Sequence, residues 1–185
     1  MDVFEAINGR RSIREYKPDP VSEEIVDRLL EAVRWAPSWA NTQCWEVVVI
    51  REPEIKAKLA EALSPRNPAL SSLGEAPVLL VFCGIRNLSG FKRGEAITDK
   101  GDWFMFDIGL AVENLCLAAH SLGLGNVIIG NFDARKLEAL LGVPENISVV
   151  AITPLGYPQK EVFAPRRKEL TDFVYFETYR KPQET

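Results

Sequence analysis

Histidine and cysteine, which carry most hydrolytic and metal sites, are scarce in this sequence. There is one histidine, His120, and there are three cysteines, far apart and without a CxxC pair: Cys44, Cys83 and Cys116. This pattern argues against structural disulfides and against a zinc site, so no metal site is expected. A Ser-His-Asp or Cys-His arrangement would have to rest on His120 alone, which removes most hydrolytic mechanisms. If the protein is an enzyme, we expect a cofactor to carry the chemistry.

Long apolar runs and an excess of positive charge are also lacking. The longest apolar run, Pro77 to Ile85, is about half of the ~20 residues that a membrane-spanning helix needs. The first residues lack the basic-then-apolar pattern of a signal peptide. Lys and Arg number 22 against 26 Asp and Glu, a net charge of −4. We therefore expect a cytoplasmic protein with no membrane or nucleic-acid partner, in which a local basic cluster must hold any anion.

The rest of the composition is typical of one globular domain spanning residues 1–185. Hydrophobic residues make up 46% of the chain and charged residues 26%, which excludes a disordered or coiled-coil protein. Periodicity and capping residues predict helices alternating with a few strands. We expect helices at 22–36 and 103–122, a helix that begins at Pro53, and a helix from an Asp133 cap to Gly142. The helix that begins at Pro53 should carry Ile55, Leu59 and Leu63 on one face. Strands are expected at 45–50, 78–83, 126–129 and 147–155.

Two features of the pattern predict a partner subunit. The helix at 103–122 is apolar over most of its circumference, more than its own small sheet can cover. The last thirty residues have no clear helix but are rich in aromatic side chains, namely Phe163, Phe173, Tyr175, Phe176 and Tyr179. Such a tail usually packs on another surface, and a second copy of the chain would supply it.

Basic residues cluster in two places that suit a phosphate group. Arg10-Arg-Ser-Ile-Arg14 combines planar multi-donor side chains with a hydroxyl, and Arg166-Arg167-Lys168 stands near the other end of the chain. Taken alone, Arg10–Arg14 is read more readily as a solvated basic turn. Together, the two clusters could close on one phosphate.

A polar loop and a glycine segment are the other candidates for a ligand site. In the loop Pro37–Trp45, Asn41 and Gln43 supply the paired donors and acceptors that read the edge of a planar heterocycle, although a plain turn explains the loop as well. In Gly123–Asn131 the glycines follow a helix and open a strand, so this is not a dinucleotide fingerprint. Gly130 either lets a ligand approach the backbone closely or marks a bulge.

Several motifs follow one another along nearly the whole chain. They are Arg10–Arg14, Pro37-Ser38-x-x-Asn41-x-Gln43-x-Trp45, Asp107-Ile-Gly109, Gly123-Leu-Gly125 with Gly130–Asp133, Pro154–Pro158, and the basic group at 166–168. None is specific alone, but in this order they resemble the FMN-dependent nitroreductase family. The resemblance implies an α+β nitroreductase-like fold, with a mixed, mainly antiparallel sheet flanked by helices. It also implies an intertwined homodimer with two FMN sites at the interface, in which the tail of about 158–185 packs on the partner subunit.

The resemblance also implies roles for individual residues. Arg10 and Ser12 would hold the FMN phosphate with Arg166 and Lys168, and Arg11 would lie along the ribityl chain or the phosphate. Arg14 would reach the pyrimidine edge and polarise N1 and O2. Pro37, Ser38 and Asn41 would come from the other subunit and line the flavin. The backbone amides of Gly130 and Asn131 would donate to the flavin near N5 and O4.

The implied activity is transfer of hydride from NAD(P)H to flavin N5, followed by reduction of a small electron-poor acceptor, a nitroaromatic or a quinone, in a ping-pong reaction. No side chain is then expected to act as a catalytic nucleophile. The alternatives are another oxidative half-reaction, namely dehalogenation, ene reduction or flavin fragmentation, and a flavin-binding protein without turnover. The chain departs from the family at Cys44, where many members have proline. In the stretch Pro65–Gly74, larger members supply an Asn and a Lys to the flavin, and only Asn67 can be aligned.

Overall fold

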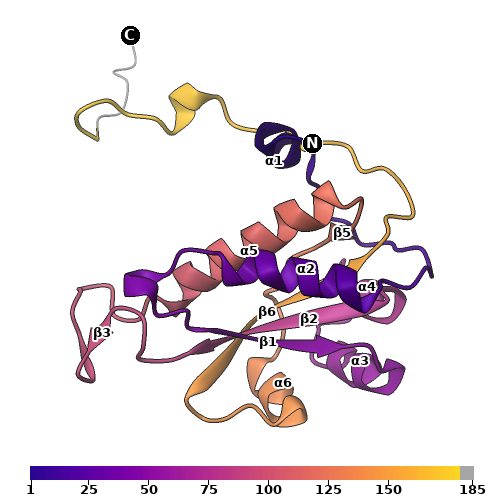
Figure 1. Ribbon diagram of the computed structural model, residues 1–185, viewed down its shortest axis with the longest axis horizontal. Coiled ribbons are helices and arrows are strands. Elements are labelled where there is room, and N and C mark those ends of the chain that lie inside the picture. Colours follow the sequence, from indigo (N-terminus) through magenta and orange to yellow (C-terminus); the bar gives the residue numbers. More distant parts are fainter. Residues whose placement is uncertain (180–185) are drawn as a thin grey trace.

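The centre of the fold is a four-stranded sheet, seen in a computed structural model that describes residues 1–179 (Figure 1). The strand order is β1-β2-β6-β5, and all neighbouring strands are antiparallel. A parallel bridge between Ser12 and Asn126 makes the sheet mixed, so the predicted fold class is confirmed. The strands are β1 Trp45–Ile50, β2 Val78–Ile85, β5 Gly125–Asn126 and β6 Ile147–Gly156.

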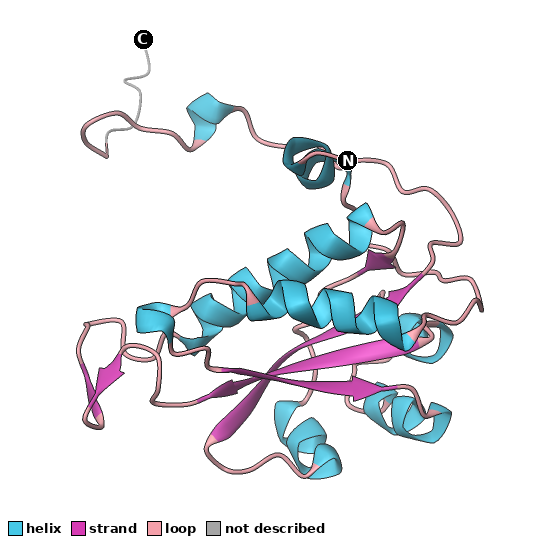
Figure 2. Ribbon diagram, in the orientation of Figure 1, coloured by secondary structure: helices cyan, strands magenta, loops and turns pink. Residues whose placement is uncertain are grey.

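Helices cover both faces of this sheet (Figure 2). On one face lie α2 (Glu23–Arg34) and α5 (Phe104–Ser121), and the other face is covered by α3 (Pro53–Ala60), α4 (Leu70–Glu75) and α6 (Ala134–Leu141). Side chains of β2 alternate between the two cores, with Leu80 and Phe82 facing α5 and Leu79 and Val81 facing α3. Because both faces are covered, β2 is apolar throughout, as its sequence predicts.

The predicted helix ends are confirmed by their capping contacts. The Ser22 hydroxyl accepts from the Ile25 amide at the start of α2, and the Asp133 carboxylate accepts from the Lys136 amide at the start of α6. Gly142 ends α6 with φ 65°, a left-handed conformation that glycine adopts without strain. A helix before the arginine cluster is also present, α1 at Val3–Gly9.

Two details of the sequence prediction are wrong. The strand expected at 126–129 is only Gly125–Asn126, because the chain then leaves the edge of β6 and pairs again only at a single bridge from Ile129 to Ile152. Ile128 consequently lies at the surface, 49% exposed. Ile55 does not share the buried face of α3, since it is 37% exposed while Leu59 is fully buried.

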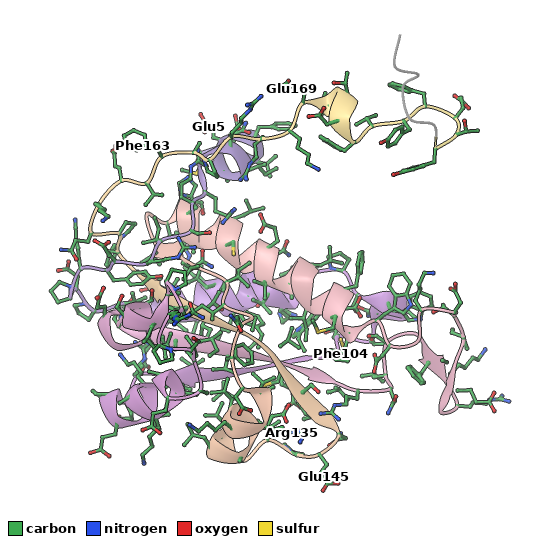
Figure 3. All side chains as sticks on the ribbon, turned by 180° about the vertical axis from the view of Figure 1, so that it is seen from behind. Glu5, Phe104, Arg135, Glu145, Phe163 and Glu169 are labelled. Carbon is green, nitrogen blue, oxygen red and sulfur yellow. The ribbon has the colours of Figure 1, made fainter. Side chains whose placement is uncertain are left out.

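Large apolar side chains remain uncovered in the single chain. In the first turns of α5, Met105 and Phe106 are each 58% exposed, although the opposite face of the helix is buried. The tail after β6 contains one short 3-10 turn, Leu170–Asp172, and runs past α1 away from the sheet (Figures 1 and 3). Phe163 on this tail is 93% exposed. Packing of the tail on a partner remains a prediction, and its part at 180–185 lies outside the described residues.

Among residues 1–179, no helix is long and apolar enough to span a membrane. The three cysteines are free and buried.

Candidate functional site

The segment Arg10–Arg14 is fixed along the edge of the sheet beside β5. The Ile13 amide donates to the Asn126 carbonyl at 2.9 Å, and the buried Tyr16 hydroxyl donates to the Ile13 carbonyl at 2.6 Å. Gly125 permits this approach, because a Cβ atom there would lie 2.4 Å from Ile13 Cγ1. At about 3.3 Å per residue, an extended segment of this length separates Arg10 from Arg14 by roughly 13 Å.

A basic cavity of about 610 Å³ lies at the Arg10 end of the segment. Its cationic lining comes from Arg10, Arg11, Lys17 and Lys160. Arg10 Nε is 3.8 Å from a carboxylate oxygen of Glu113 on α5, and Arg10 keeps further donors free for a ligand. Arg11 Nη1 donates to the carbonyls of Asn8 and Arg10, both at 2.7 Å, which fixes its guanidinium beside the cavity.

His120 lines the same cavity from the last turn of α5. Its ring lies against Gly9, where a Cβ atom would come within 2.4 Å of Nε2. Burial, together with the positive charges of Arg11 and Arg10, lowers the pKa of His120 below its usual value. The imidazole is therefore neutral at pH 7, and the arginines and lysines supply the positive charge of the cavity.

A second cavity of about 310 Å³, which we call the ring-edge cavity, lies at the Arg14 end. It brings together Arg14, Gly130 and Asn131, which the sequence assigned to one end of a flavin. Gly130 has no atom within 4 Å of the position a Cβ would take, so its backbone is open to an approaching group. Asn67 also lines this cavity, and its side-chain amide donates to the Asn131 carbonyl at 3.1 Å. The alignment of Asn67 was the one signal in the sequence that pointed to it.

The loop between α2 and β1 is backbone-strained. Ala40, Asn41 and Gln43 have φ of 44°, 57° and 49°, in the left-handed region that non-glycine residues seldom adopt. The Gln43 amide donates to the Ser38 hydroxyl at 2.9 Å, and the Gln43 side chain donates to Asn41 Oδ1 at 3.2 Å. Strain of this kind persists only where the surroundings hold it, and it concentrates at ligand sites.

Asp107, in the first turn of α5, anchors this loop to the helix. Its side chain is buried, at 1% exposed. Oδ1 accepts from the Trp39 amide at 3.0 Å, and Oδ2 accepts from the Ser89 hydroxyl at 2.6 Å. Cys44 Sγ lies 3.6 Å from Oδ2, and burial together with the Asp107 charge raises the pKa of this thiol. At the position where the family often has proline, Cys44 therefore supports the loop as an un-ionised thiol.

The predicted site residues fall into separate groups within one chain. Pro37 and Ser38 line a third cavity, which shares no lining residue with the basic cavity or the ring-edge cavity. Ser12 lies midway along Arg10–Arg14, where its carbonyl is 3.5 Å from Arg14 Nη1. Arg166 and Lys168 lie in the exposed tail and line none of these three cavities.

Comparison with known proteins identifies the family of this chain. Residues 7–157 match the model of the nitroreductase family. The chain is 34% identical to a protein of Methanothermobacter thermautotrophicus named as an NADH dehydrogenase/NAD(P)H nitroreductase, an alignment covering 92% of this chain and 87% of the relative. It is 32% identical to the FMN reductase [NAD(P)H] of Bacillus subtilis, covering 85% of this chain and 66% of the relative.

A crystal structure of a nitroreductase family protein from Clostridium difficile superposes with a TM-score of 0.83 at 25% identity, over 96% of this chain and 99% of that protein. Other relatives are named 5,6-dimethylbenzimidazole synthase, from Rhodospirillum rubrum at 31% identity, and iodotyrosine deiodinase 1, from Rattus norvegicus at 26%. The names of the relatives thus span several different reactions. Because the family model covers most of its length, the chain belongs to the nitroreductase family, and it is an NAD(P)H oxidoreductase.

Proposed function

We propose that the protein is an FMN-dependent oxidoreductase that takes hydride from NAD(P)H and passes it to a small electron-poor acceptor, a nitroaromatic or a quinone. The observation that supports this most directly is the pair of cavities at the two ends of Arg10–Arg14. The basic cavity is lined by four cationic side chains, and the ring-edge cavity is lined by amide groups and two arginines, Arg14 and Arg66. A ligand with a phosphate at one end and a polar ring edge at the other fits a segment of about 13 Å.

Each end has a defined task in this proposal. Arg10 and Ser12 bind the phosphate with Arg166 and Lys168 of the tail, and Arg11 lies beside the phosphate or the ribityl chain. At the other end Arg14 faces the pyrimidine edge, while Gly130 and Asn131 offer backbone donors. Asn67 fits this end as an additional polar contact, because its carboxamide already faces the Asn131 backbone.

The flavin, when bound, supplies the two-electron chemistry, and the protein orients the reactants and polarises the flavin ring. Arg14 is exposed in the single chain, and in this proposal its guanidinium would stabilise negative charge developing at N1 and O2 of a bound flavin. No histidine lines the ring-edge cavity, so no proton relay is assigned there. The nicotinamide and the acceptor must each reach the same ring face within about 3–3.5 Å, so they bind in turn and the kinetics are ping-pong.

We further propose a homodimer in which Pro37, Ser38 and Asn41 of one subunit line the flavin of the other. The loop and the Arg10–Arg14 segment line different cavities within one chain, and a second subunit would bring them together. The exposed apolar residues of α5 and the tail are the surface available for that contact.

The purified protein should be a yellow homodimer that releases FMN, rather than FAD or riboflavin, on denaturation. Absorbance spectroscopy, chromatography of the released cofactor and light scattering measure these properties. Under anaerobic conditions NADH or NADPH alone should bleach the flavin absorbance, and an acceptor added afterwards should restore it. If bleaching by both reductants required the acceptor to be present, the ping-pong mechanism would be wrong. A colourless monomer that FMN cannot reconstitute would refute the proposal as a whole.

The roles of single residues can be tested with matched variants. Arg10→Ala should weaken FMN binding by about 10- to 100-fold, as expected for loss of a charge-assisted contact of about 1.5–3 kcal/mol. Arg135→Ala on α6 (Figure 3) is the control and should bind FMN normally. Mixing Arg10→Ala chains with Asn41→Ala chains should give heterodimers with one intact and one doubly damaged site. Equal impairment of both sites would place the two residues in one subunit.

Two other functions remain alternatives. Relatives named for dehalogenation and for benzimidazole synthesis favour a different oxidative half-reaction on the same flavin. A panel of acceptors after anaerobic reduction separates this from nitroaromatic or quinone reduction. A flavin-binding protein without turnover would bind FMN but would not oxidise NAD(P)H with any acceptor.

A further inference from the structure

Trp39 meets two aromatic side chains from a distant part of the sequence, beside the strained loop. Trp39 belongs to the loop, Trp103 ends the segment 86–103 between β2 and α5, which we call the insert, and Phe106 lies in the first turn of α5. The Trp39 and Trp103 rings are tilted by 38° with centroids 5.1 Å apart, and Trp103 and Phe106 meet edge to face at 5.4 Å. They border the cavity of about 220 Å³ that Pro37 and Ser38 also line, which we call the aromatic cavity.

The Trp103 indole and the Trp39 backbone are each fixed by contacts within the chain. Trp103 Nε1 donates to the Thr98 hydroxyl at 2.9 Å. Gly90, at φ 82°, lies so close that a Cβ atom there would come within 2.5 Å of Trp103 Cδ1. The Trp39 backbone amide is fixed by the buried carboxylate of Asp107 at 3.0 Å. The Trp103 ring is therefore preorganised, and a ligand that stacks on it need not order this side chain.

The polar groups of the aromatic cavity are already engaged within the chain. The Ser38 hydroxyl accepts from the Gln43 amide, and both oxygens of Asp107 accept hydrogen bonds. The lining contains no lysine or arginine. An anionic ligand would meet the Asp107 charge without a compensating cation, whereas an uncharged ring meets electron-rich indole faces. Electron-poor rings stack favourably on such faces.

We propose that Trp39, Trp103 and Phe106 form the recognition surface for an uncharged, electron-poor aromatic acceptor of about one ring. This inference rests on the proposed function, because Pro37 and Ser38 join the aromatic cavity to the loop that we place over the flavin of the partner. The acceptor ring lies between the indoles of one subunit and the flavin of the other. Trp103 is the residue to alter first, because it contacts both other rings.

The test compares Trp103→Ala with Trp103→Phe, and uses Trp35→Ala as the control. Trp35 is an exposed indole on the end of α2 that does not line the aromatic cavity. Titration calorimetry of the oxidised holoprotein with para-nitrobenzyl alcohol, without reductant, measures acceptor binding directly. Trp103→Ala should raise the Kd about tenfold, Trp103→Phe should raise it less, and the control should stay within about twofold of the unaltered protein.

Kinetics provide the second measurement. In Trp103→Ala the KM for para-nitrobenzyl alcohol should rise about tenfold, and the ratio of its kcat/KM to that for ferricyanide, which does not stack, should fall about tenfold. In the control Trp35→Ala this ratio should stay within about twofold of the unaltered protein. Equal losses for both acceptors, or an unchanged Kd, would overturn the inference. If Trp103→Ala did not fold, Phe106→Ala, on an exposed turn of α5, would carry the same comparison. Failure of the unaltered protein to oxidise NAD(P)H would refute the proposed function, and calorimetry would still decide the aromatic subsite.

Discussion

One substitution at Asp107 tests whether its carboxylate holds the strained loop against α5. Asp107→Ala removes the acceptor for the Trp39 amide at 3.0 Å and for the Ser89 hydroxyl at 2.6 Å. A hydrogen bond to a charged group contributes about 1.5–3 kcal/mol, and Ser89 would be left fully buried without that partner. The cost of burying the Asp107 charge offsets part of this sum. We therefore expect the free energy of unfolding to fall by about 3 kcal/mol.

Urea unfolding followed by tryptophan fluorescence, at one fixed protein concentration, measures the change. Asp107→Asn keeps the shape and one good acceptor and should lose only about 1 kcal/mol. Asp99→Ala is the matched control, because the Asp99 side chain is 82% exposed and pairs only with the adjacent Lys100; it should stay within about 0.5 kcal/mol of the unaltered protein. If Asp107→Ala also stayed within that range, the carboxylate would not hold the loop.

Three further outcomes follow from close contacts of the fold. Gly125→Ala should lower the free energy of unfolding by about 1–3 kcal/mol, because its Cβ would lie 2.4 Å from Ile13 Cγ1; full stability would mean that Arg10–Arg14 shifts easily. Gly142→Ala, at φ 65°, should lose about 1 kcal/mol in the same assay. Because folding lowers the pKa of His120, the unfolded chain binds more protons than the folded chain below about pH 6.5. The free energy of unfolding should therefore decrease as the pH is lowered below that value. This loss should be smaller in His120→Gln, and equal losses in the two proteins would contradict the argument.

Local signals in the sequence predicted the elements that position the site. Ser22 and Asp133 mark helix starts because their side chains satisfy free backbone amides, and β2 reads as buried because both of its faces are covered. Each of these signals lies within a few residues of the feature that it predicts.

The parts that the sequence did not predict depend on contacts between distant residues. The left-handed conformation of Ala40 could not be predicted, because alanine does not favour it and the sequence has no glycine at that position. Hydrogen bonds to distant residues, and not a local preference, hold the loop in this conformation. The short helix α4, which begins directly after the segment that carries Asn67, is stabilised by packing of Leu73 and has too few turns for a periodic signal. The contact between Trp39 and Trp103 joins residues far apart in the chain and depends on how the insert folds.

The burial of every thiol bears on the chemistry of the acceptors that we propose. Quinones are alkylating agents as well as oxidants, and a thiolate is the group that adds to them. Burial raises the pKa of Cys83 and Cys116 to about 11, so at pH 7 only about one thiol in ten thousand of each is ionised. Cys44 is equally buried and its pKa is also raised. In the function that we propose, the folded protein should therefore resist alkylation of its three thiols by a quinone acceptor.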